Sequence, residues 1–110
     1  MNKPIDPTTW LDLMTDTAPR FAKAKAERVY LEEYRKSLKA ILMKASQSKT
    51  SVAQEADAYS DPTYIQHIQA LKIAVHGEEA LRWKLVTAQT AIEVWRSQES
   101  SNRMIDRATS

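Results

Sequence analysis

Cysteine is absent from this chain, and glycine occurs only once, at Gly77. Without cysteine the chain can form no disulfide, thiolate nucleophile or cysteine-based zinc site. A single glycine also argues against a β-rich fold, because tight turns between strands favour residues that adopt positive φ. The composition therefore predicts an all-α fold.

Long hydrophobic runs are missing as well. No stretch approaches the roughly 18 consecutive apolar residues of a membrane span. The first ten residues lack the basic patch and apolar run of a signal peptide. With 43% hydrophobic residues over 110 positions, the chain is too apolar for a disordered segment. We expect one folded helical domain that makes no membrane contact.

The longest pattern in the sequence is an amphipathic helix that begins at Pro62, with Asp61 as its N-cap. Its apolar positions recur with a period slightly below 3.6, which is typical of a helix that supercoils against a partner. The amphipathic pattern runs from 62 to 98, and a helix of about 37 residues extends roughly 55 Å. The expected stripe consists of Tyr64, Ile68, Leu71, Val75, Leu81, Leu85, Ala88, Ile92 and Trp95.

The nearest partner for this helix is the segment from 19 to 47, folded back as a long antiparallel, coiled-coil-like hairpin. Ala24, Leu31, Leu38, Leu42 and Ala45 form its apolar stripe. Pro19 is expected to separate this helix from a short preceding one. Thr17 is the expected N-cap of the helix that starts at Pro19. The predicted order is an irregular arm at 1 to 7, helices at 8 to 15, 19 to 47, 51 to 59 and 62 to 102, and a frayed tail at 103 to 110.

A second apolar row lies on another side of the long helix and consists of Ile73, Ala80, Trp83, Ala91 and Val94. A single hairpin cannot bury both rows, and an exposed row with a tryptophan is typical of an interaction surface. We therefore predict a homo-oligomer, most simply a dimer that forms a four-helix bundle. In the alternative, the short helices cover this row within one chain.

Basic residues gather between 19 and 50, a range that contains nine bases and three acids, and acids dominate from 51 to 81. Helical spacing places a basic row beside the apolar stripe, made of Lys25, Arg28, Arg35, Lys36 and Lys39. Such a row could follow a phosphate backbone. The alternative is that it pairs with acids on a neighbouring helix, which Glu55, Asp57, Asp61, Glu78 and Glu79 could supply.

No catalytic pattern stands out in the sequence. His67 and His76 lie nine residues apart, on opposite faces of a helix, and no neighbour completes a metal-ligand set. There is no glycine-rich phosphate loop and no nucleophile or zinc-protease motif. We expect a non-enzymatic protein without a metal or cofactor.

Five segments resemble small helical accessory proteins of tailed bacteriophages and prophages: AKAKAERVYL at 22 to 31, SVAQE at 51 to 55, AYSDP at 58 to 62, LRWKL at 81 to 85 and VWRS at 94 to 97. Genes for such proteins often lie near replication and recombination genes. The resemblance implies a phage accessory or adaptor protein in the cytoplasm of the bacterial host. Its partner would be a phage or host protein of DNA recombination or replication. The alternative is direct, sequence-independent DNA binding through the basic row.

Overall fold

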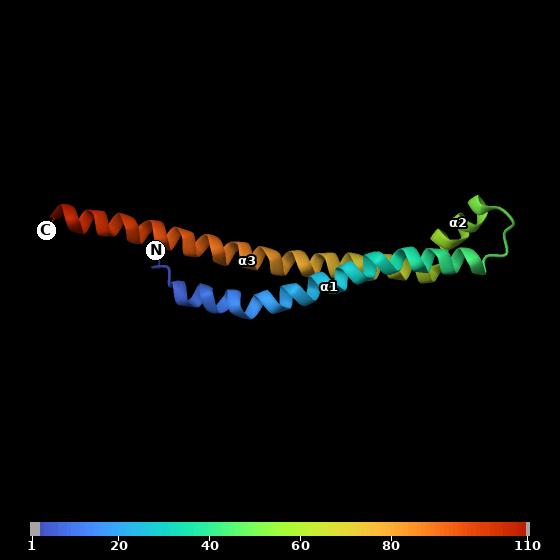
Figure 1. Cartoon of the computed structure of the whole chain (residues 1–110), viewed down its shortest axis with the longest axis horizontal. Coiled ribbons are helices and arrows are strands. Elements are labelled where there is room, and N and C mark those ends of the chain that lie inside the picture. The colour runs from blue at the N-terminus through green and yellow to red at the C-terminus, as the bar shows by residue number, and fades with distance from the viewer. Residues whose placement is uncertain (1–2, 110) are drawn as a thin grey trace. The chain divides into compact units, whose positions relative to one another are not determined.

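The computed structural model describes residues 3 to 109, which form three helices and no strand. Helix α1 covers Pro7–Ala45, α2 covers Ser51–Ser60 and α3 covers Pro62–Thr109. Figure 1 shows α1 and α3 as the two long helices and α2 as a short one between them in the chain. The all-α prediction and the long helical hairpin are confirmed, while the four-helix bundle of a dimer stays a prediction.

The chain forms two compact units. Unit 1 combines residues up to Phe21 with Ala80–Ser110, and unit 2 spans Ala22–Glu79. Unit 1 therefore pairs the start of α1 with the second half of α3. Unit 2 contains the rest of α1, all of α2 and the start of α3.

Helix α1 is continuous where the sequence predicted two helices with a break before Pro19. Pro19 is exposed, so its ring points away from the neighbouring helix. Thr17, the expected N-cap, lies inside the helix and is completely buried. Packing of Thr17 and Phe21 on the covered side holds the helix together despite the hydrogen bond that proline cannot donate. The actual cap is Asp6, whose Oδ1 accepts a hydrogen bond from the Thr8 N–H at 3.0 Å.

The covered side of α3 follows an alternating spacing of three and four residues, the spacing of a coiled-coil seam. All of these seam positions are buried or half-buried: Tyr64, His67, Leu71, Ala74, Glu78, Leu81, Leu85, Ala88, Ile92, Trp95 and Glu99. Ile68 and Val75 were expected in this stripe but are exposed. His67 and Ala74 take the seam positions there, each one residue earlier than predicted, and Glu78 is a seam residue that the predicted stripe lacked.

The same spacing runs along α1. Its seam positions are Trp10, Met14, Thr17, Phe21, Ala24, Arg28, Leu31, Arg35, Leu38, Leu42 and Ala45, of which Arg35 and Ala45 are exposed. Within unit 2 the two helices run antiparallel, because Arg28 contacts Glu78 while Leu31, further along α1, contacts His67, earlier in α3. In unit 1, Thr17 and Ala88 are completely buried.

Short polar segments connect the helices. Thr50 caps α2 through a hydrogen bond from the Ala53 N–H to its Oγ1 at 3.2 Å. Asp61 caps α3, as predicted, by accepting the Thr63 N–H at 2.8 Å. Helix α3 then continues to Thr109, so the described part of the expected frayed tail at 103 to 110 is helical, and Ser110 lies outside the described residues.

Candidate interaction surfaces

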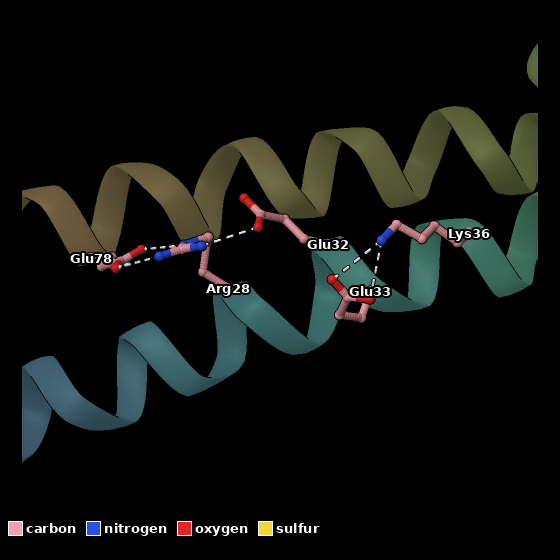
Figure 2. Close-up of polar contacts among 5 residues, drawn as sticks. All are labelled: Arg28, Glu32, Glu33, Lys36 and Glu78. Carbon is pink, nitrogen blue, oxygen red and sulfur yellow. Dashed lines mark hydrogen bonds and ion pairs between the residues drawn. The ribbon is translucent and has the colours of Figure 1, made fainter.

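Arg28 does not stand free on the surface of unit 2. Its guanidinium binds the Glu78 carboxylate of α3 with two nitrogens, Nε at 2.6 Å and Nη2 at 3.0 Å, and binds Glu32 of its own helix through Nη1 at 3.0 Å. Figure 2 shows this side chain reaching from α1 to the opposite helix. Hydrogen bonds to Glu78 and then Glu32 raise the pKa of Arg28 further above its ordinary range. This bidentate geometry fixes the pairing of two helices.

Lys39 of α1 also pairs with a carboxylate on another helix, in this case α2. Its ammonium donates to Glu55 Oε1 at 3.2 Å and lies 4.8 Å from the centre of the Tyr59 ring. Contacts with Tyr59 and Glu55 raise the pKa of Lys39. Among residues 3 to 109, Lys36 pairs only with Glu33 of its own helix. Both side chains are exposed, so this is a weak surface interaction.

The basic row is therefore only partly available to an outside ligand. Arg28 and Lys39 pair with Glu78 and Glu55, two members of the acidic block, as the alternative interpretation of the sequence expected. Lys25 and Arg35 are exposed, and neither forms an ion pair with another described residue. Glu78 is only 7% exposed, so its pairing with Arg28 is part of the interior of unit 2.

The predicted oligomer row is divided between the two units. Ile73 belongs to unit 2, whereas Ala80, Trp83, Ala91 and Val94 belong to unit 1. Ile73 is 73% exposed and Trp83 is 56% exposed; Val94 and Ala80 are also exposed, and Ala91 is half-buried. The guanidinium of Arg82 lies 4.6 Å from the centre of the Trp83 ring. Large apolar side chains of this row therefore face solvent in both units.

Two tyrosines of α1, which none of the predicted surfaces includes, prove to be prominent. The rings of Tyr30 and Tyr34 stack at 6.0 Å between centroids, and Tyr34 also lies 5.5 Å from the His67 ring of α3. His67 Nε2 donates to the Leu31 carbonyl at 2.7 Å, so this histidine links α1 to α3. The spacing of four between the tyrosines was the available signal, since it places both on one side of a helix.

The three described helices contain no segment apolar and long enough to cross a membrane. Within residues 3 to 109, no three potential ligands among His, Asp and Glu lie close enough together to hold a metal ion. Comparisons of the chain with protein families, with characterised proteins and with solved structures found no match. The resemblance to phage accessory proteins therefore stays a prediction.

Proposed function

We propose that this chain is a non-enzymatic adaptor, a helical homo-oligomer that binds a protein partner through exposed apolar helix faces. The observation that supports this is the imbalance between covered and exposed apolar side chains. Among the described residues, three hydrophobic side chains are buried, Leu38, Ala58 and Ala88, while fifteen large ones are exposed. Exposed apolar residues that gather on one side of a helix mark interaction surfaces.

The resemblance to phage accessory proteins supplies the class of partner to test first. We propose a phage or host protein of DNA recombination or replication, encountered in the cytoplasm of the bacterial host. The surface proposed for this partner is the Trp83 row of unit 1, consisting of Ala80, Trp83 and Val94. Tryptophan is among the residues that most often dominate the binding energy of an interface.

Direct DNA binding is the weaker proposal, because two of the five bases in the row are paired across helices. Neutralising phosphates requires cations that are free to approach them. A charge reversal at Arg28 or Lys39 would disturb the contacts between helices as well as any DNA contact. The sharper test is therefore Lys25→Glu with Arg35→Glu, two exposed positions.

The adaptor proposal is tested by light scattering and by binding to purified recombination and replication proteins, with wild type and Trp83→Glu compared. We expect a multiple of 12.5 kDa for the wild type and loss of partner binding in the variant, with helix content retained. Val52→Glu, at an exposed apolar residue of α2, is the matched control. A monomer that binds none of these proteins, but binds short DNA in a salt-dependent way that Lys25→Glu and Arg35→Glu abolish, would overturn the proposal.

A further inference from the structure

One side of unit 2 carries an apolar surface that helix α2 leaves uncovered. Tyr30, Tyr34 and Ile41 lie on α1 at spacings of four and seven, which places them on one side of that helix. Tyr34 and Ile41 each directly precede a seam residue of α1, Arg35 and Leu42. In an antiparallel pair of helices, the residues that precede the corresponding seam positions of both helices share one side of the hairpin.

Residues of α3 on that same side include Ala70, which precedes Leu71, and Ile73, one turn further along. The Tyr34 ring reaches the His67 ring of α3, and the Tyr30 ring stacks on that of Tyr34. Ile73 also lines an open hollow of about 590 Å³ together with Gln69, Lys72 and His76. We call Tyr30, Tyr34, Ile41 and Ile73 the tyrosine face; all four are exposed, Tyr30 at 62% and Ile73 at 73%.

Helix α2 occupies the opposite side of the hairpin. Lys39 directly follows the seam residue Leu38 and contacts both Glu55 and Tyr59 of α2. The Tyr59 ring also meets Tyr64, at the start of α3, with 5.3 Å between centroids. Helix α2 therefore covers one side of the unit 2 hairpin, and no described residue covers the tyrosine face on the other side.

We propose that a second copy of this chain covers the tyrosine face, in a two-fold dimer that pairs this face with itself. This inference rests on the proposed self-association and adds where the second copy binds. The four side chains of this face come from both helices of unit 2 and are between 38% and 73% exposed. A stable interface of standard size takes about 800 Å² from each partner.

Stability argues for a second copy over a different protein. Unit 2 buries few apolar side chains: Leu38 and Ala58 are its only buried hydrophobic residues among those described. Small domains with so little buried apolar area often depend on association to remain folded. A second copy is present whenever the chain is made, whereas another protein need not be. Tyrosine also suits a self-complementary face, because it offers a large apolar area at low cost in side-chain entropy.

The test compares single substitutions on the two flanks of unit 2 by light scattering over a range of protein concentrations. Tyr30→Glu and Ile73→Glu should each raise the dimer dissociation constant by about tenfold or more, the effect expected of a central interface residue. Val29→Glu, at an exposed apolar residue beside Tyr30 but on the α2 flank, should leave it unchanged. Circular dichroism at each concentration checks that the helices remain.

A second measurement covers variants that fail to fold. Because the chain has no cysteine, Ile73→Cys introduces a single thiol whose reaction with a maleimide reports its exposure. Labelling should slow as the protein concentration rises, whereas Val29→Cys should react at one rate throughout. A wild-type monomer at every concentration would overturn both this inference and the proposed self-association. A wild-type dimer that Tyr30→Glu and Ile73→Glu leave intact, but Val29→Glu or Trp83→Glu dissociates, would overturn this inference alone.

Discussion

Thr17 provides the most direct test of the packing in unit 1. Its side chain is the largest that is completely buried, and its Oγ1 finds no hydrogen-bond partner among the described residues. A buried hydroxyl without a partner has lost its hydrogen bonds to water and gained none in return. Thr17→Val replaces this hydroxyl with a methyl group of similar size, so it removes the penalty without leaving a cavity. We expect the variant to be more stable than the wild type.

The size of the gain follows from the cost of the unpaired hydroxyl, which is about 1 to 3 kcal/mol for a buried polar group. Threonine and valine have similar helix propensities, so the backbone contributes little to the difference. For 110 residues the entropy of unfolding near the midpoint is about 230 cal/mol/K. One kcal/mol then corresponds to about 4 °C, and Thr17→Val should raise the midpoint of thermal unfolding by about 4 to 13 °C.

The assay is thermal unfolding followed by circular dichroism at one fixed protein concentration, because association alters the midpoint. Thr15→Val is the matched control: Thr15 is exposed, and its hydroxyl donates to the Leu11 carbonyl at 2.9 Å. The control should change stability by no more than about 0.5 kcal/mol. A Thr17→Val midpoint at or below that of the wild type would refute the reasoning, since it would mean that the hydroxyl has a partner in solution.

Three further predictions concern unit 2. Gly77→Ala should stabilise the protein by up to about 1 kcal/mol, because a Cβ at Gly77 would meet open space and alanine favours the helix. The gain should appear as a higher midpoint of urea unfolding, and a lower midpoint would indicate that something outside the chain packs there. Glu78→Gln should lower the midpoint of thermal unfolding, since Arg28 loses its bidentate carboxylate partner inside the unit, while Glu27→Gln at an exposed position should not. Equal midpoints for Glu78→Gln and the wild type would contradict a structural role for the pair. Hydrogen bonds from Ser46 and then Ser48 lower the pKa of Asp57, so its contribution to stability is complete above the ordinary aspartate value and is lost as the pH falls through the lower folded value. Asp57→Asn should therefore reduce the loss of stability between pH 5 and pH 2, and an unchanged acid profile would count against this carboxylate.

Local signals in the sequence were sufficient for the start of α3 and for the all-α class. Asp61 and Pro62 fix that boundary through one carboxylate and one pyrrolidine ring, without help from distant residues. The continuity of α1 depends on tertiary contacts instead. Proline weakens a helix interior wherever it occurs, and only the position of its neighbours Thr17 and Phe21 in the seam decides whether packing compensates.

The state of the basic row also depends on tertiary contacts that the sequence does not reveal. Its residues are visible from their spacing, but whether each charge is free or paired depends on how α1 and α3 align. Arg28 and Glu78 are fifty residues apart, and a shift of one turn between the helices would separate them. The tyrosine face was also hard to predict, because it depends on knowing which flank of the hairpin α2 covers.

Polar residues inside the seam of unit 2 explain how that alignment is set. Arg28 and Glu78 bind each other, and His67 donates to the Leu31 carbonyl, so these two polar links between α1 and α3 are satisfied together in one register. Apolar residues at these positions would pack in several registers with similar energy, whereas polar pairs in a seam select one at some loss of stability. The same register places Tyr34 of α1 beside His67 of α3 and thereby assembles the tyrosine face from both helices. Variants that break the Arg28 and Glu78 pair should therefore weaken self-association as well as stability, even though neither residue belongs to the proposed interface.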